Sequence, residues 1–264
     1  MLHKLRTLLR PKSAMPSASV PTGERIYALG DIHGRLDLFE IIAEAIEADD
    51  AARGAARTTV ILLGDLVDRG PDSAGVIAAA RIWQQHRRVR ILTGNHEEMF
   101  LAASDRLPAF RVFLRFGGRE TLLSYPIVAA AFQAAELPDA QAMMIEAVPR
   151  EDLEFISTFE DCIQIGGYAF VHAGIEPGVP LAQQSPHELR WIREPFLSHQ
   201  GDLGSVIIHG HTITDEAEVR RNRIGIDTGA YASGRLTAIG LEGTERWLIQ
   251  TNSAGGNKCT ITPV

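Results

Sequence analysis

Three short polar motifs, each directly after an apolar run, constrain the fold of this chain more than any other feature. They read Gly30-Asp31-Ile32-His33-Gly34, Gly64-Asp65-Leu66-Val67-Asp68-Arg69-Gly70 and Gly94-Asn95-His96-Glu97. Their glycines let the backbone bend sharply and approach a ligand closely, which a Cβ atom would obstruct. Because the turns at the carboxyl ends of strands converge in an open α/β sheet, the three motifs are predicted to meet.

The segments around the motifs predict β-α-β units. Apolar runs of strand length occupy 25–29, 59–63 and 89–92. Amphipathic stretches predict helices over 36–48, over 73–86 and from just after Asn95. This alternation of strand and helix is typical of an α/β domain.

The rest of the chain changes character twice. Residues of about 104–160 are rich in alanine and leucine and are interrupted by glycines and prolines, which predicts a helical insertion. Short β-like runs follow at 162–165, 169–172, 206–209, 219–226, 235–241 and 246–249. The second half is therefore predicted to be mainly sheet.

Composition excludes several classes of protein. The 264 residues are 45% hydrophobic and 22% charged, which suits one domain over 24–264 after a basic, disordered tail over 1–23. An organellar transit peptide is the less favoured interpretation of this tail.

The net charge of −7 argues against nucleic acid, and no apolar run reaches the roughly 20 residues that cross a bilayer, so no membrane partner is expected. Cys162 and Cys259 form no disulfide or zinc pattern, which favours a cytoplasmic location.

The strand-end motifs carry side chains that bind metal ions. Six oxygen and nitrogen ligands lie at or just after predicted strand ends: Asp31, His33, Asp65, Asn95, His172 and His211. A mixed set of this kind suits first-row ions, manganese first, with iron or zinc as alternatives. Six ligands are too many for one ion that also binds water, and an aspartate can bridge two ions. The sequence therefore predicts a centre of two divalent metal ions. Any one of these motifs alone would usually be a turn or an ordinary buried or surface residue, but the three glycine-flanked motifs and the segments with His172 and His211 occur together.

With these motifs the chain resembles the calcineurin-like metallophosphoesterases, and among them the phosphoprotein phosphatases of the bacterial and phage lambda type. The resemblance covers about 25–241, including His172-Ala173-Gly174, Gly210-His211-Thr212 and the stretch from Gly117-Gly118 to Tyr125. It implies an α/β fold in which two β-sheets pack as a sandwich flanked by helices.

The resemblance also implies how the metal ligands are shared. One ion would be held by Asp31, His33 and Asp65, and the other by Asp65, Asn95, His172 and His211. Asp65 would then bridge the two ions.

Four further residues match functional positions of the family. The resemblance makes His96 the general acid and Asp68 the carboxylate that orients it, and it makes Arg69 a ligand of the substrate phosphate. Arg193 resembles a second phosphate-binding arginine, although an ion pair with Glu194 is the competing interpretation.

Two positions depart from the family pattern or remain open. Many members have arginine directly before Gly-Asn-His-Glu, but here that position is Thr93, which removes a positive group near the phosphate. His209 points the same way as His211 along its strand, so it is expected near the site but is not included among the ligands.

These features together predict hydrolysis of a phosphate monoester. A water shared by two metal ions loses a proton readily, and the resulting hydroxide would attack phosphorus in line. Serine/threonine phosphoprotein is the predicted substrate, because Asp68 and Glu97 fit the protein phosphatases better than the symmetrical dinucleoside tetraphosphate hydrolases, which are the first alternative. A catalytically silent protein-binding scaffold is the second alternative, and the intact set of ligands argues against it. The sequence does not indicate an oligomeric state.

Overall fold

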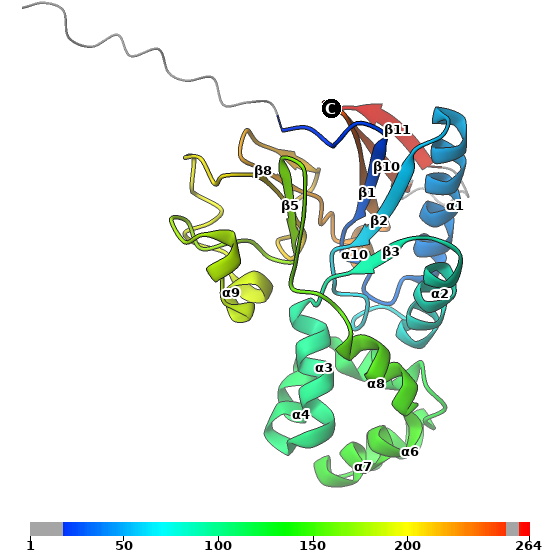
Figure 1. The fold of residues 1–264 in the computed structure, drawn as a ribbon. Helices are drawn as coiled ribbons and strands as arrows, with labels where there is room; N and C mark the ends of the chain where they lie inside the picture. The colour runs from blue at the N-terminus through cyan, green and yellow to red at the C-terminus, as the bar shows by residue number, and fades with distance from the viewer. Residues whose placement is uncertain (1–17, 252–258) are drawn as a thin grey trace, which may run out of the picture.

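The computed structural model describes residues 18–251 and 259–264, so the first 17 residues of the expected tail lie outside it. Figure 1 shows the arrangement of the elements. The strands are β1 (Glu24–Leu29), β2 (Arg57–Leu62), β3 (Val89–Ile91), β4 (Cys162–Ile165), β5 (Tyr168–Val171), β6 (Val206–His209), β7 (Glu218–Val219), β8 (Arg223–Gly225), β9 (Thr237–Glu242), β10 (Glu245–Thr251) and β11 (Cys259–Pro263). The helices are α1 (Leu36–Arg53), α2 (Ser73–His86), α3 (Asn95–Asp105), α4 (Leu107–Phe113), α5 (Arg119–Leu123), α6 (Ala129–Ala134), α7 (Leu137–Ala147), α8 (Arg150–Ser157), α9 (Pro186–Trp191) and α10 (Ala230–Ser233), with a π-helical turn η1 (Leu114–Gly118) and a 3-10 turn η2 (Leu181–Gln183).

The strands form two mixed sheets. The first has the order β11-β10-β9-β1-β2-β3, in which β1, β2 and β3 are parallel and β9, β10 and β11 are each antiparallel to their neighbours. The second has the order β4-β5-β6-β8-β7, in which β5, β6 and β8 are parallel. The polar motifs follow the carboxyl ends of these parallel strands.

The alternation of side chains along each strand lets the two sheets pack face to face. In β1, Ile26 and Ala28 belong to the core between the sheets, together with Phe170 of β5. Tyr27 and Leu29 point to the opposite face and belong to the core under the helices. A third apolar cluster joins the outer face of the second sheet to α9. The expected sandwich of two sheets flanked by helices is confirmed.

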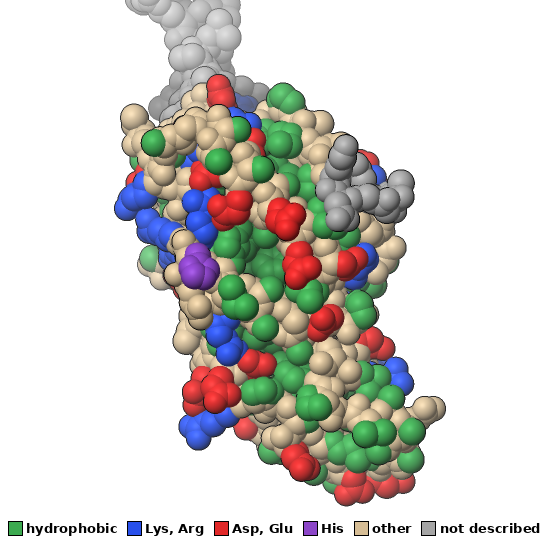
Figure 2. All heavy atoms as spheres, turned by 90° about the vertical axis from the view of Figure 1, so that its right-hand side faces the viewer, with side chains coloured by type: hydrophobic (Ala, Val, Ile, Leu, Met, Phe, Trp, Pro, Cys, Tyr) green, Lys and Arg blue, Asp and Glu red, His purple; other side chains and the backbone are tan. Residues whose placement is uncertain are grey.

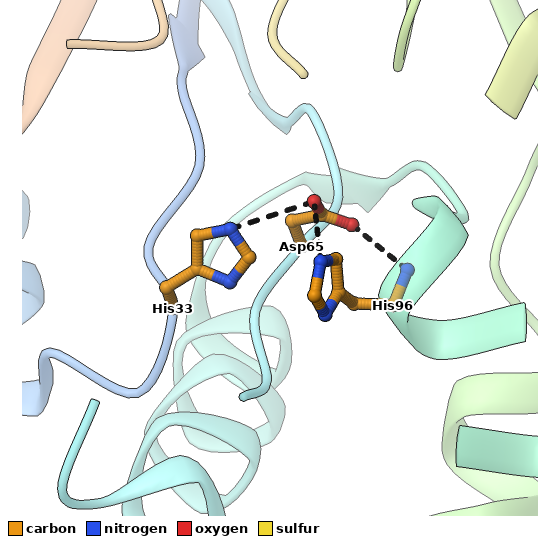
Figure 3. Close-up of side chains that lie close together, drawn as sticks. All are labelled: His33, Asp65 and His96. Atoms are coloured by element: carbon orange, nitrogen blue, oxygen red, sulfur yellow. Dashed lines mark hydrogen bonds and ion pairs between the residues drawn. The ribbon is translucent and has the colours of Figure 1, made fainter. Parts of the chain in front are cut away.

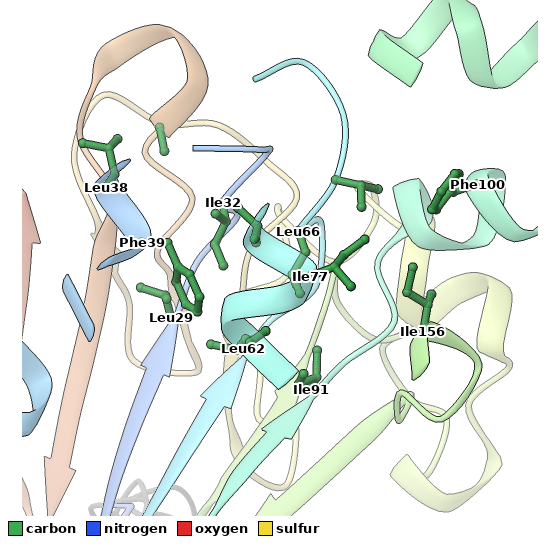
Figure 4. Close-up of a cluster of buried hydrophobic side chains, with 14 of the residues drawn as sticks. Leu29, Ile32, Leu38, Phe39, Leu62, Leu66, Ile77, Ile91, Phe100 and Ile156 are labelled. Atoms are coloured by element: carbon green, nitrogen blue, oxygen red, sulfur yellow. The ribbon is translucent and has the colours of Figure 1, made fainter. Parts of the chain in front are cut away.

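The core under α1 and α2 fixes the strand ends in space. Figure 4 shows Leu29, Leu62 and Ile91, one from each of the parallel strands, beneath Phe39 of α1 and Ile77 of α2. Burying an aliphatic or aromatic side chain of this size stabilises the fold by roughly 1.5–3 kcal/mol. The loops that leave β1, β2 and β3 therefore start from a rigid base.

The helices α4 to α8 lie within the segment that was predicted to be a helical insertion, and they sit below the sheets in Figure 1. Gly117 kinks this segment with a φ of +105°. On the face shown in Figure 2, hydrophobic side chains gather at the lower end of the molecule, with acidic side chains beside them. Val128 and Ile145 are examples of exposed apolar residues in this segment.

The structure differs from the predictions at several places, of which three concern the strands and the tail. The run 219–226 is a hairpin of β7 and β8, because the polar turn at Arg220 separates two short strands. The edge strand β11 lies beyond the predicted runs. Residues 18–23 of the expected tail are packed, since Val20 is buried between the sheets and its N–H donates to the carbonyl of Gly243.

Within the described part of the chain, no helix is both long and apolar enough to span a bilayer.

Candidate metal centre

Backbone hydrogen bonds tie the first two polar motifs together. The N–H groups of Ile32 and His33 both donate to the carbonyl of Asp65, at 3.1 and 2.8 Å, and the N–H of Gly34 donates to the carbonyl of Leu66. These bonds continue the parallel pairing of β1 and β2 beyond the strands. Asp65 and His33 are therefore held side by side by the main chain.

Glu97 joins the second motif to the third. Its carboxylate accepts backbone N–H bonds at 2.8 Å from Asp65, Leu66 and Gly94, and a longer one of 3.4 Å from Val67. The side chain is fully buried in the first turn of α3. Sequence reasoning used Glu97 only to separate two families of enzymes and missed this organising role.

Hydrogen bonds set the tautomers of two histidines. The Nδ1 of His33 lies 2.8 Å from the carbonyl of Val67, and the Nδ1 of His172 lies 2.8 Å from the carbonyl of Leu63. A carbonyl only accepts, so each Nδ1 carries the proton and each Nε2 keeps a lone pair for a metal ion. Burial lowers the pKa of His33 to about 3 and also lowers the pKa of His172, which keeps both rings neutral.

Asp65 is shared by two groups of side chains that could each hold a metal ion: His33, Asp65 and His96 in one (Figure 3), and Asp65, His172 and His211 in the other. Within each group the ligand atoms all lie within 4.8 Å of one another. One carboxylate oxygen of Asp65 is 3.6 Å from Nε2 of His33, and the other is 3.4 Å from Nε2 of His172.

Asn95 completes the second group. Its Oδ1 is 3.0 Å from Nε2 of His172 and 2.9 Å from Nδ1 of His211. Ligands about 2.1 Å from a first-row ion lie about 3–3.5 Å from each other, so these separations fit an ion. The hydroxyl of Thr212, next to His211, is also buried without a hydrogen-bond partner. The described residues therefore fit a centre of two ions with Asp65 between them.

Asp31 lies beside the first group rather than within it. Its carboxylate accepts the N–H of His211 at 3.0 Å, and a Cβ at Gly210 would come within 2.0 Å of it. Burial, followed by the negative charges of Asp227 and Asp65, raises the pKa of Asp31 well above its usual range. Sequence reasoning missed Asp227, although Ile226-Asp227-Thr228-Gly229 repeats the pattern of an acid after an apolar run.

His96 differs from the other histidines of the centre. Its Nδ1 lies 2.6 Å from a carboxylate oxygen of Asp68, while its Nε2 faces Asp65 at 3.9 Å. Burial opposes protonation of His96, but the carboxylates of Asp65 and Asp68 raise its pKa above the usual value. The pKa of His211 is lowered to about 3 by burial and by nearby charges, including that of Arg193.

Thr121, from the helical segment, holds the Asp68 carboxylate. Its hydroxyl donates to Asp68 at 2.6 Å and accepts the N–H of Asp68 at 2.8 Å. Nothing in the sequence pairs these residues, which are 53 positions apart. The carbonyl of Gly117 accepts the N–H of Arg69, so the same segment also anchors the next residue.

Replacing Thr121 with valine, which keeps the volume, is expected to weaken the positioning of His96 through Asp68. We expect kcat on a phosphoserine peptide to fall about 10-fold, and the free energy of unfolding to fall by about 1–3 kcal/mol because buried polar groups lose a partner. Thr121→Ser restores the hydroxyl and should restore both quantities. Equal kcat for the valine variant and the wild type would show that Asp68 needs no support from Thr121.

The two predicted phosphate-binding arginines lie differently. The guanidinium of Arg69 donates to Nε2 of His33 at 2.9 Å and to Nε2 of His96 at 3.0 Å, so it occupies the His33 lone pair that a bound metal ion would take. Arg193 is exposed, and Glu194 binds Ser198 rather than Arg193.

An aromatic ring stands beside Arg69. Tyr231 of α10 lies 4.9 Å from the Arg69 guanidinium and meets His33 edge-on at 5.5 Å. The ring is 36% exposed, so it forms part of the accessible rim of the centre. Sequence reasoning gave no sign of this residue.

His209 and Thr93, the position left open and the departure from the family pattern, lie outside both metal-ligand groups. His209 packs edge-on against Phe196, and its Nε2 faces the guanidinium of Arg223 at 3.3 Å. Thr93 is 6% exposed, and its N–H donates to the carbonyl of Glu160.

Backbone strain is concentrated at the centre. In the described part of the chain, the residues other than glycine with positive φ are His33, Asp65, Asp68, Arg69 and His211. Such conformations are uncommon outside glycine and persist where the surrounding structure enforces them. All five belong to the predicted site.

The chain belongs to the calcineurin-like phosphoesterase family, which it matches over residues 24–235. This is a family of metal-dependent phosphoesterases, in agreement with the two groups of candidate ligands around Asp65.

Individual relatives differ in their named activities. Serine/threonine-protein phosphatase 1 of Salmonella typhimurium is 25% identical over 87% of this chain and 98% of its own length. The symmetrical bis(5'-nucleosyl)-tetraphosphatase of Nitrosospira multiformis is 23% identical over 88% of this chain and 97% of its own length. Among solved structures, a cold-active protein-tyrosine phosphatase of a psychrophilic Shewanella has the same fold, with a TM-score of 0.58, 15% identity, and coverage of 94% of this chain and 82% of that chain.

Proposed function

We propose that this metal-dependent phosphoesterase is a phosphoprotein phosphatase that hydrolyses phosphoserine and phosphothreonine. The observation that carries the proposal is the 2.6 Å contact between His96 Nδ1 and Asp68. A serine or threonine alkoxide is a very basic leaving group, so its departure needs a proton in the transition state. A nucleoside phosphate leaves as a much weaker base and needs such an acid less.

The proposed centre holds two divalent ions, manganese first, with iron or zinc as alternatives. Asp31, His33 and Asp65 would hold one ion, and Asp65, Asn95, His172 and His211 the other. When bound, the ions would acidify water and neutralise charge on the phosphoryl group. The chain's own contribution is to fix the ligands through the loops after the parallel strands.

Residues outside the ligand set would bind and protonate the substrate. Arg69 and Arg193 would donate charge-assisted hydrogen bonds to the phosphate oxygens. His96, once protonated on the Nε2 that accepts from Arg69 in this structure, would deliver that proton to the leaving oxygen, while Asp68 holds Nδ1 and thereby the orientation of the ring. The relative named serine/threonine-protein phosphatase 1 supports this substrate class. A cytoplasmic location remains a prediction from the spacing of the two cysteines.

A second candidate is hydrolysis of a dinucleoside tetraphosphate, and Tyr231 is the observation that favours it. An exposed aromatic ring beside a phosphate-binding arginine could stack on a nucleobase, and such stacking stabilises by about 1–3 kcal/mol. Relatives carrying this activity in their names match most of the chain.

One batch of manganese-loaded protein assayed on both substrate classes tests the proposal. We expect kcat/KM to be higher for a phosphoserine peptide than for diadenosine tetraphosphate. Replacing Tyr231 with alanine should change the peptide value less than about 3-fold, whereas a base-stacking role would cost about 10- to 100-fold on the dinucleotide. Tyr231→Phe keeps the ring and serves as the control.

The opposite ranking of the two substrates would favour the dinucleotide hydrolase. Two bound metals without turnover of any phosphoester would favour the scaffold instead.

A further inference from the structure

Asp227 is a buried carboxylate beside the metal centre that the proposed mechanism does not use. It follows β8 in the loop Ile226-Asp227-Thr228-Gly229. A Cβ at Gly30 would come within 2.5 Å of the carbonyl of Ile226, so the loops after β1 and β8 pack backbone against backbone. This close packing brings Asp227 next to Asp31, and the two carboxylates act directly on one another.

The hydrogen bonds made to Asp227 do not account for its burial. The side chain is 2% exposed, and its carboxylate accepts the N–H of Gly229 at 2.9 Å, while its other hydrogen-bond partner is the side chain of Asp31, itself an acid. Glu97 is as deeply buried, but its carboxylate accepts four backbone N–H bonds. A carboxylate removed from water needs hydrogen bonds or a cation in compensation. Glu97 has four backbone donors, whereas Asp227 has one backbone donor and otherwise faces Asp31, an acid that can donate to it only by keeping its own proton.

The charges around Asp227 point to a cation. Three buried carboxylates, those of Asp31, Asp65 and Asp227, lie close enough to influence one another. Arg69 is a positive group near them, but its guanidinium donates to His33 and His96 rather than to a carboxylate. Buried like charges are stable only with a compensating positive charge between or beside them.

We propose that Asp227 is a further carboxylate of the metal centre, which strengthens binding of the ion held by Asp31 and His33. The inference rests on the metal centre of the proposed function and not on the substrate. With Asp227 included, the two halves of the centre differ in their ligands. The half with Asp31, His33 and Asp227 is rich in carboxylates, and the other consists of His172, His211 and Asn95, with Asp65 shared between the two. Carboxylate oxygens favour manganese, whereas imidazole suits zinc, so Asp227 directs the first half towards manganese.

Asp227→Asn tests this proposal because asparagine keeps the acceptor for Gly229 and removes the charge. Titration calorimetry on metal-free protein, with MnCl2 alone and with ZnCl2 alone, measures the number of ions bound and the Kd of each. We expect the tighter of the two Mn²⁺ sites, which is the carboxylate-rich one, to lose about 10- to 100-fold in affinity, as is usual when a supporting carboxylate is removed. The Zn²⁺ affinity of the other site should stay within about 3-fold.

Asp202→Asn is the matched control. The carboxylate of Asp202 also accepts the N–H of the glycine two residues later, at 2.8 Å, but it is exposed and belongs to another loop. This variant should bind both ions as the wild type does. Thermal unfolding without metal gives a second readout, since removing a buried negative charge should leave the Tm of Asp227→Asn equal to or above that of the wild type.

Wild-type Kd values for both ions in Asp227→Asn, or a lower Tm in the absence of metal, would overturn the inference and leave Asp227 as a turn acceptor. A wild-type protein that binds neither ion would overturn the proposed function as well, so the two failures are distinguishable. If Asp227→Asn does not fold, Asp227→Ser, which also keeps an acceptor, is measured against the same criteria.

Discussion

Asp65→Asn is expected to abolish turnover by removing the residue on which both proposed ions would depend. One carboxylate oxygen of Asp65 faces His33 at 3.6 Å and the other faces His172 at 3.4 Å. Asparagine has one oxygen and an amide NH2 group, which donates hydrogen bonds and cannot bind a cation. We expect metal content to fall below one equivalent per chain and kcat to fall by more than about 10³-fold, since the metals supply the activated water.

The fold should survive this change. Asp65 has a φ of +51°, a conformation that asparagine also adopts readily. Elemental analysis and a thermal melt of the variant separate loss of metal from loss of structure, with the exposed Asp139→Asn on α7 as the control. Adding manganese back to chelated protein should restore the wild type and the control but not Asp65→Asn. Two equivalents of bound metal with near-normal turnover would contradict the bridging role.

His96→Asn is expected to slow the reaction while leaving the metals in place. Loss of a general acid costs roughly 10²- to 10⁴-fold on phosphoserine substrates. Nitrophenolate departs readily without a proton, so the defect on nitrophenyl phosphate should be smaller. Steady-state kinetics on both substrates, with metal analysis of the same samples, measures the difference.

The proximity of His96 to Asp65 makes this experiment informative, because His96 lies within one of the two groups that could hold an ion. Equal losses on both substrates together with a missing metal would make His96 a ligand. Asp68→Asn should act through the same ring, so the double variant should be little slower than His96→Asn alone. Independent, multiplying effects would mean that Asp68 has a role of its own.

The sequence predicted those parts of the fold that depend on local patterns. The helix over 73–86 and the strand over 206–209 have the predicted bounds, because each has a clear period and a polar boundary. The edge strand β11 escaped prediction, since it pairs only with β10 and buries little of its surface. The turn at Arg220 was also missed, because two short strands on either side resemble one run.

The site was predictable where its residues follow strand ends, and it was not where tertiary packing supplies them. Asp65 and His172 follow apolar runs that the sequence displays. Thr121 reaches Asp68 because the helical segment folds back under the loop after β2, which no local pattern indicates. Asp227 is the intermediate case, since its strand-end position was visible but its contact with Asp31 depends on how the two sheets meet.

The five left-handed residues at the centre limit how this protein can be made more heat-resistant. His33, Asp65, Asp68, Arg69 and His211 each hold a backbone conformation that costs on the order of 1 kcal/mol, against a total stability of about 5–15 kcal/mol for a typical domain. Glycine at any of these positions would relieve strain and delete a side chain of the site at once. Selection for thermal stability alone would therefore accumulate inactive proteins, and a screen for durable variants has to score turnover in the same round.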